Sequence, residues 1–204
     1  MLVDSRRAFA RCVNHALEAQ GLPARPDAEL HPFLGPPLHA TFAQLAGEAL
    51  ADACVEAYRA RYRAQAAAES SVIEGMDDAL ALLDEELVVV TSKPQALAEP
   101  LLDALGLRPR FAAIFGPSLH DRAEPKPATL ARALATHAPR ALVGDRSFDI
   151  HAARTHGIRA VGVLWGIGSE DELRGAGAHA IAATPADLVR LLGMRLRGQS
   201  PQSH

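Results

Sequence analysis

A change of residue pattern near residue 76 constrains the fold more than any other feature of this chain. From there on, helical stretches alternate with short apolar runs that are rich in β-branched residues. The runs cover residues 87–90, 112–115, 141–143, 160–164 and 180–182. Alternation of this kind is typical of βαβ units, in which helices cover a parallel sheet. We therefore predict an α/β protein with a parallel sheet.

The first 70 residues predict helices alone. Apolar residues at helical spacing indicate one helix from Asp4 to about Gln20 and two more over 38–45 and 48–63. The connecting residues 21–38 are dense in Pro and Gly, which indicates a turn-rich connection, with a short helix within it as an alternative. This all-helical start followed by alternating helices and strands predicts two structurally different parts in one short chain.

Composition excludes several classes of partner. The formal net charge is −3 and no basic block is present, which argues against a protein that binds the phosphate backbone of nucleic acid. No run approaches the roughly 20 apolar residues of a membrane span, and the polar N-terminus does not resemble a signal peptide. Cys12 and Cys54 form no CxxC motif, so a reducing cytoplasm is the expected location.

Polar side chains gather where the predicted strands end. Thr91 and Ser92 follow the run LVVV, Asp145 and Asp149 follow ALVG, and Lys126 lies in a loop before a helix. Open parallel sheets bind ligands beyond the carboxyl ends of their strands, so these side chains are the place to expect chemistry. Hydroxyls, an ammonium and two carboxylates together suit a phosphate group and a magnesium ion.

Each of these residues also has a structural interpretation. Asp149 falls in the first turn of a helix, where a carboxylate complements the helix N-terminus. Thr91 and Ser92 precede a Lys-Pro turn and are typical helix-capping residues. Lysine is scarce, because the 21 basic residues comprise 19 Arg and only Lys93 and Lys126, which favours a specific role for a compact charge.

Three arginines on one predicted helix have a simpler interpretation. Arg59, Arg61 and Arg63 recur at every second position. A run of charges of this kind is typical of a solvated helix face, and we interpret it so; contact with a substrate is the alternative.

Four segments in order carry a resemblance to a known family. VVVTSKP, EPKP and ALVGDRSFDIHAARTHGI, followed by VGVLWG, resemble motifs two, three and four of the haloacid dehalogenase superfamily, and phosphoglycolate-phosphatase-like enzymes in particular. The helical segment with LGPPL is similar to the small inserted cap of these enzymes. The resemblance implies a Rossmann-like core over 76–197 and a helical cap over 1–75, with the start of the core at the extreme N-terminus. A tail over 198–204 follows, which we expect to be disordered.

The resemblance also implies a reaction and roles in it. The reaction is hydrolysis of a small phosphate monoester, such as phosphoglycolate or a nucleoside monophosphate, through an aspartyl-phosphate with Mg²⁺ as cofactor. Thr91, with Ser92, would bind the phosphoryl group, and Lys126 would stabilise its charge. Asp145 would ligate Mg²⁺, and Asp149 would support the metal or orient Lys126. The cap would close over the site and select the leaving group.

The chain departs from the family at its first motif. That motif reads Asp-x-Asp-Gly-Thr/Val-Leu-Val-Asp-Ser, and here the sequence begins MLVDS, so Met1 occupies the Thr/Val position. Asp4 matches the later Asp, and both catalytic carboxylates would lie upstream of Met1. We hypothesise an N-terminally shortened form of a longer phosphatase that is inactive in this form. The alternative is a protein without a nucleophile that binds a phosphorylated ligand or a partner protein.

Overall fold

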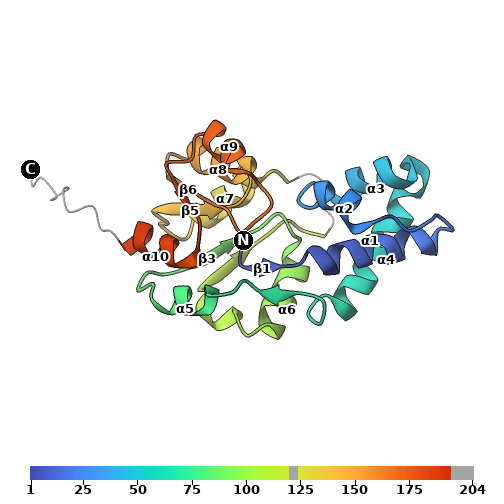
Figure 1. Cartoon of the computed structure of the whole chain (residues 1–204), viewed down its shortest axis with the longest axis horizontal. Coiled ribbons are helices and arrows are strands. Elements are labelled where there is room, and N and C mark those ends of the chain that lie inside the picture. The colour runs from blue at the N-terminus through green and yellow to red at the C-terminus, as the bar shows by residue number, and fades with distance from the viewer. Residues whose placement is uncertain (120–123, 194–204) are drawn as a thin grey trace, which may run out of the picture. The chain divides into compact units, whose positions relative to one another are not determined.

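The computed structural model describes residues 1–119 and 124–193, so the predicted tail over 198–204 lies outside the described residues (Figure 1). The chain packs as two compact units. The helical unit contains Leu2–Ile73 and Glu86–Pro139, and the three-strand unit contains Met1, Glu74–Glu85 and the chain from Arg140 onward.

Helices make up the first part of the helical unit, as the sequence predicts. They are α1 (Arg6–Ala19), α2 (Asp27–Leu30), the short 3-10 helix η1 (His31–Phe33), α3 (Leu38–Ala46) and α4 (Glu48–Gln65). Both α1 and α3 pack on α4 (Figure 1). None of the described helices combines the length and the apolar character that crossing a membrane requires.

An aromatic cluster forms the centre of this helical packing. The Tyr58 ring stacks on Tyr62 with 5.5 Å between ring centroids, and it meets the edges of Phe9 and Phe42 at 6.0 and 6.1 Å. All four side chains are buried, and such pairs add to the energy of apolar burial. Burial also raises the pKa of the Tyr58 hydroxyl well above its ordinary value.

A two-stranded ribbon marks where the helices begin and end. Strand β1 (Val3–Asp4) pairs antiparallel with β2 (Ser71–Val72), with Val3 opposite Val72. The Asp4 carboxylate also caps α1, because its Oδ1 accepts a hydrogen bond from the Arg6 amide at 3.0 Å. The prediction of helices alone over the first 70 residues is therefore wrong for β1, and the helices α1–α4 form an insertion between two paired strands.

The rest of the helical unit is a parallel strand pair with flanking helices. Strand β3 (Val88–Val90) pairs with β4 (Ala113–Phe115) in parallel, with Val89 opposite Ile114. The helices α6 (Gln95–Ala104) and α7 (Lys126–Leu134) and the 3-10 helix η2 (Arg108–Arg110) complete the unit. Helix α7 packs on both strands.

The second unit is a three-stranded parallel sheet with helices. Its strands are β5 (Ala141–Gly144), β6 (Arg159–Val163) and β7 (Ala180–Ala182), in the order β5-β6-β7. The helices are α5 (Met76–Ala81), α8 (Ser147–Thr155), α9 (Glu170–Gly175) and α10 (Pro185–Gly193). Val161 and Val163 of the central strand are fully buried, which places the core of this unit at β6. The parallel strands confirm the predicted α/β class.

Strands β3 and β5 are among those that pair on one edge only within the residues that the structure describes. β3 is an end member of the pair β3-β4, and β5 is an end member of β5-β6-β7. The Val88, Val89 and Val90 side chains are only half-buried, although such an apolar run is typical of a strand covered on both faces. Each of these strands thus presents an unpaired row of backbone donors and acceptors.

Candidate active site

Thr91 occupies a tight turn directly after β3. Its amide donates to the Phe115 carbonyl at 2.9 Å, which extends the pairing with β4 by one residue. Its hydroxyl accepts a hydrogen bond from the Lys93 amide at 3.1 Å within the turn, whereas the N-cap of α6 is Pro94, so the helix-capping interpretation of this threonine is wrong. A hydroxyl that accepts a bond can still donate its own hydrogen to an anion. Ser92, in the same turn, is exposed.

Lys126 is the first residue of α7. The residues around it are fixed by Glu124, whose carboxylate accepts a hydrogen bond from the Thr129 hydroxyl at 2.8 Å and pairs with Arg132 at 3.2 Å. Arg132 also donates to the Gly116 carbonyl at 2.5 Å, which joins α7 to the loop after β4. Because α7 packs on β3 and β4, Lys126 and the Thr91 turn belong to one packed structure within the helical unit.

Asp145 lies in the other unit, immediately after β5, and a loop after β6 holds it. Its Oδ2 accepts a hydrogen bond from the Ile167 amide at 3.0 Å, and its carbonyl accepts one from the Gly168 amide at 3.0 Å. A Cβ on Gly166 would lie 2.2 Å from the Asp145 Cβ, and one on Gly168 would lie 2.2 Å from the Asp145 carbonyl oxygen. Both glycines are therefore required for the loop to approach this carboxylate.

Gly166 and Gly168 were not among the site residues predicted from the sequence. The available signal is the pair of glycines in WGIG directly after a buried strand, since glycine there permits close backbone approach. Beside them, Trp165 donates from Nε1 to the Met1 carbonyl at 2.9 Å. The Met1 nitrogen lies 3.9 Å from Asp145 Oδ1.

Asp149 caps the helix that follows Asp145. Its Oδ2 accepts a hydrogen bond from the Arg146 amide at 3.2 Å at the start of α8, and the residue is only 6% exposed. Gly144 leaves the necessary room, since a Cβ there would lie 2.2 Å from the Asp149 Cβ. The capping interpretation of Asp149 thus holds, and its role toward a metal stays a prediction.

Glu172 fixes the same loop from α9. Its carboxylate accepts hydrogen bonds from the Ser147 amide at 2.7 Å and from Arg146 Nε at 3.0 Å. Burial raises the pKa of Glu172, but these donors outweigh it and hold the pKa below its ordinary value. The loop that carries Asp145 therefore has a defined conformation.

The carboxylates of Asp145 and Asp149 could supply part of the oxygen ligands of a Mg²⁺ ion. Within residues 1–119 and 124–193, no group of three or more His, Cys, Asp or Glu side chains could hold a metal ion. Mg²⁺ requires fewer protein ligands, since it usually binds one or two carboxylates and keeps waters and phosphate oxygens. Asp145 and Asp149 thus suit Mg²⁺ better than a metal that needs a complete protein cage.

The interpretation of Arg59, Arg61 and Arg63 as a solvated face is wrong for two of the three. Arg61 makes a two-pronged ion pair with Glu69 at 2.8 and 2.9 Å. Arg59 donates from Nη2 to the Leu119 carbonyl at 2.8 Å and its side chain is 16% exposed. Only Arg63 is exposed.

Comparison with known proteins identifies the family. The family model described as haloacid dehalogenase-like hydrolase matches residues 1–163. The chain belongs to this family. Tyrosine-protein kinase PtkA of Mycobacterium tuberculosis is 34% identical over 95% of this chain and 69% of its own length. A 5'-nucleotidase of Pseudomonas aeruginosa is 34% identical over 93% of this chain and 89% of its own length.

A solved structure shows the same family fold. The crystal structure of a predicted phosphatase from Clostridium acetobutylicum superimposes with a TM-score of 0.85 at 28% identity, and the match covers 94% of this chain and 93% of that one. The predicted membership of the haloacid dehalogenase superfamily is therefore confirmed. The roles of Thr91, Ser92, Lys126, Asp145 and Asp149 in this haloacid dehalogenase-like hydrolase stay predictions.

Proposed function

We propose that this protein, in its full-length form, is a Mg²⁺-dependent phosphatase of small phosphate monoesters. The observation that carries the proposal is Asp145 at the carboxyl end of β5, whose Oδ2 accepts a hydrogen bond from the Ile167 amide and whose backbone carbonyl accepts one from the Gly168 amide. The similarity to a 5'-nucleotidase supports the reaction class. The substrate is a small phosphorylated metabolite, with phosphoglycolate and nucleoside monophosphates as the first to test.

Each residue has a separate task in this proposal. Asp145 and Asp149 would hold Mg²⁺, which supplies positive charge to a bound phosphate. The Thr91 hydroxyl donates to a phosphoryl oxygen, and the exposed Ser92 lies next to it in the same turn. The Lys126 ammonium stabilises the negative charge of the phosphate, including the charge that develops on the leaving-group oxygen during the reaction. Free, buried Cys12 and Cys54 are consistent with the reducing cytoplasm as the location.

We place the nucleophilic carboxylate on a further strand that carries Asp-x-Asp. No Asp-x-Asp occurs within the 204 residues. The unpaired edges of β3 and β5 support the proposal, because each has backbone groups that another strand would satisfy. An aspartyl-phosphate would form there by attack of this carboxylate on phosphorus, which breaks the ester P–O bond and releases the alcohol. Water would then attack the same phosphorus, releasing inorganic phosphate and regenerating the carboxylate. The form that spans residues 1–204 is then inactive.

Phosphate release tests the proposal. A longer protein that includes upstream residues with Asp-x-Asp is assayed beside the 1–204 form, with Mg²⁺ and either phosphoglycolate or a nucleoside 5'-monophosphate. We expect turnover by the longer protein alone, and loss of most of it in D145N and K126A. D171N, an exposed aspartate on α9, is the matched control and keeps its activity. Unchanged turnover in D145N or K126A would refute the assigned roles.

The absence of Asp-x-Asp from this sequence also favours a second candidate, a protein without a nucleophile that binds a phosphorylated ligand or a partner protein. The mass of the intact protein from its own cells separates the two. A mass above 21.6 kDa, with Asp-x-Asp in the added residues, supports the phosphatase. A mass that matches Met1 to His204 supports the binding protein.

A further inference from the structure

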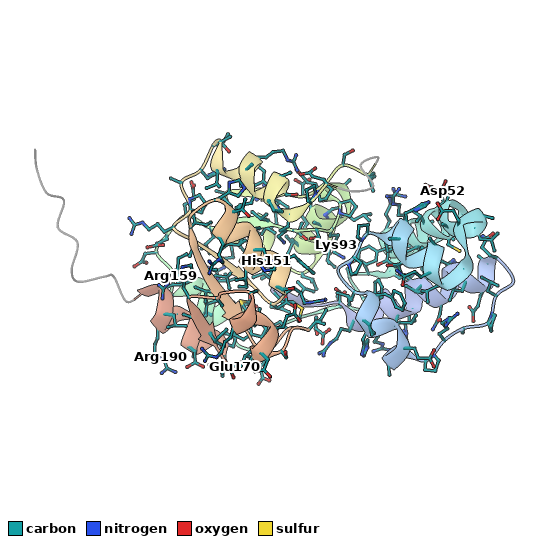
Figure 2. The ribbon with its side chains drawn as sticks, turned by 90° about the horizontal axis from the view of Figure 1, so that it is seen from above. Asp52, Lys93, His151, Arg159, Glu170 and Arg190 are labelled. Atoms are coloured by element: carbon teal, nitrogen blue, oxygen red, sulfur yellow. The ribbon has the colours of Figure 1, made fainter. Side chains whose placement is uncertain are left out.

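The Glu172 side chain caps a helix other than its own. Ser169 and Glu172 have the spacing of a capping box, and the Ser169 hydroxyl accepts a hydrogen bond from the Glu172 amide at 3.1 Å. In such a box the glutamate returns to the serine amide, whereas the Glu172 carboxylate accepts from the amide of Ser147, the first residue of α8, at 2.7 Å. Figure 2 labels Glu170 on α9 and His151 on α8, the two helices that this bond joins. The carboxylate thus satisfies one of the amides that a helix N-terminus leaves unpaired.

Hydrogen bonds close a ring between the loops after β5 and β6, within the three-strand unit. The Oδ2 and the backbone carbonyl of Asp145 accept from the Ile167 and Gly168 amides, each at 3.0 Å. The ring closes from α9, where the Glu172 carboxylate returns to Ser147, two residues after Asp145. A Cβ on Gly168 would lie 3.2 Å from Glu172 Oε2, so the loop also packs closely against Glu172. Loss of the Glu172 carboxylate therefore opens this ring beside Asp145.

Glu172 also offsets the charge of a cation that lies between the two predicted metal ligands in the sequence. Arg146 directly follows Asp145 and precedes Asp149. Its Nε donates to Glu172 Oε1 at 3.0 Å, and its guanidinium carbon lies 5.0 Å from the centre of the Phe148 ring. The Arg146 and Glu172 side chains are 22% and 28% exposed, and charges interact more strongly where water is partly excluded. Without the carboxylate of Glu172, the charge of Arg146 would oppose binding of a divalent cation at the neighbouring aspartates.

We propose that Glu172 is a positioning residue for a magnesium site at Asp145 and Asp149. The inference rests on the proposed function, because it takes these two carboxylates to hold Mg²⁺. Glu172 acts through its neighbours: its bond to the Ser147 amide fixes the turn that carries Asp145, and its charge offsets that of Arg146. Groups that orient metal ligands in this way typically contribute about tenfold or more to metal affinity.

Binding of Mn²⁺ tests this role without turnover. Electron paramagnetic resonance of the free ion gives the Kd for the 1–204 protein and for the longer protein with Asp-x-Asp. We expect E172A to raise the Kd by about tenfold or more. E172Q should raise it by a smaller factor, because glutamine keeps an oxygen that can accept from the Ser147 amide. D145N identifies the binding that belongs to this site, and D171N, at an exposed position of α9, is the matched control and should keep the wild-type Kd.

A second substitution separates the effect of charge from that of support. R146M removes the guanidinium and keeps an apolar side chain beside Phe148. In the E172Q background it should restore most of the lost Mn²⁺ affinity, whereas in E172A it should restore only part, because the Ser147 amide still lacks its acceptor. Hydrogen exchange without metal, read over residues 145–147 and 166–168, should be faster in E172A than in the wild-type protein.

The possible failures of the two proposals differ. Wild-type Mn²⁺ affinity in both E172A and E172Q overturns the positioning role alone, and so does a raised Kd in E172Q that R146M leaves unchanged. If E172A does not fold, E172Q and its double variant with R146M decide the question. Failure of both forms of the protein to bind Mn²⁺, or binding that D145N leaves intact, overturns the proposed metal site together with this inference.

Discussion

At the scale of single residues, the position of Asp145 depends on glycines in the neighbouring loop, which have no side chain. The loop over residues 166–168 reaches this carboxylate only because Gly166 has no Cβ; one placed there would lie 2.2 Å from the Asp145 Cβ. A contact that short requires backbone movement, because the obstructing atom is not the end of a flexible side chain. Glycine at 166 is thus a condition for the hydrogen bond between Ile167 and Asp145.

We predict that G166A displaces Asp145 and destabilises the protein by about 1–3 kcal/mol, as overpacking of a tight site usually does. Urea unfolding gives the stability, and Mg²⁺ titration of the longer protein's activity gives the effect on the site. G175A is the control, because nothing lies within 4 Å of a Cβ there and alanine favours the helix α9. Equal effects of the two substitutions would contradict this assignment.

Glu69 is the centre of a charge cluster in the helical unit. Its carboxylate pairs with Arg61 and, at 3.0 Å, with Arg11, and its side chain is 9% exposed. The hydrogen bonds from Arg61 outweigh the effect of burial and lower the pKa of Glu69 to about 2 from its usual 4.5. A lowered pKa in the folded state stabilises the protein above the unfolded-state value, and this contribution is lost as pH falls from about 4.5 to about 2.

We predict that E69Q lowers the free energy of unfolding by about 2–3 kcal/mol at pH 7. The difference from the wild-type protein should decrease between pH 4.5 and pH 2, because protonated glutamate also loses the ion pairs. Denaturant unfolding at several pH values measures it. E170Q breaks a pair between exposed Glu170 and Arg174 and should change stability by about 0.5 kcal/mol or less. A pH-independent effect of E69Q would contradict the prediction.

At the scale of elements, strand β6 differs from β3 and β5 in the number of its partners. β6 pairs with β5 and β7, whereas β3 and β5 each pair with one strand among the described residues. An unpaired edge in a parallel sheet is exposed to water or to another chain. The three strands are therefore expected to differ in amide hydrogen exchange.

We predict that amides of β3 and β5 exchange faster than those of β6 in the 1–204 protein. In a longer protein with a further strand they should slow by about tenfold or more, which corresponds to one net hydrogen bond per amide. Hydrogen exchange read by mass spectrometry compares the two proteins, and β7, which is not expected to gain a partner, is the internal control. No change in β3 and β5 would argue against a strand at either edge.

Elements with a clear apolar period could be predicted from the sequence. The helices around Phe9 and Tyr58 and the strand at Val89 have such a period, and the structure has helices or a strand there. The two-residue strands β1 and β2 are too short to show alternation, and α9 (EDELRG) has one buried apolar residue, so neither could be found. The partners of Arg59 and Arg61 lie 60 and 8 residues away, and spacing within one helix does not reveal them.

At the scale of the whole molecule, the two units carry different natural probes. The single tryptophan, Trp165, belongs to the three-strand unit, and both cysteines belong to the helical unit. Cys12 and Cys54 are fully buried, and burial raises the pKa of both thiols, which slows their reaction in the folded state. Tryptophan emission and thiol labelling should therefore report on different parts of the chain.

We predict that E69Q shifts the denaturant midpoint measured by thiol labelling more than that measured by tryptophan emission, and that G166A does the reverse. The reason is that Glu69 lies in the unit with the cysteines and Gly166 in the unit with Trp165. Coincident shifts in both signals for both variants would show that the units unfold as one.

The β1–β2 ribbon makes the inserted helices a removable module. Asp4 and Ser71 are opposed across an antiparallel pair, so the chain leaves the helices directly beside the point where it entered them. Opposed residues of this kind can be joined by a two-residue hairpin turn. Evolution, or a protein engineer, could therefore exchange the whole segment between Asp4 and Ser71 for a shorter loop or for a foreign domain without rerouting the rest of the chain.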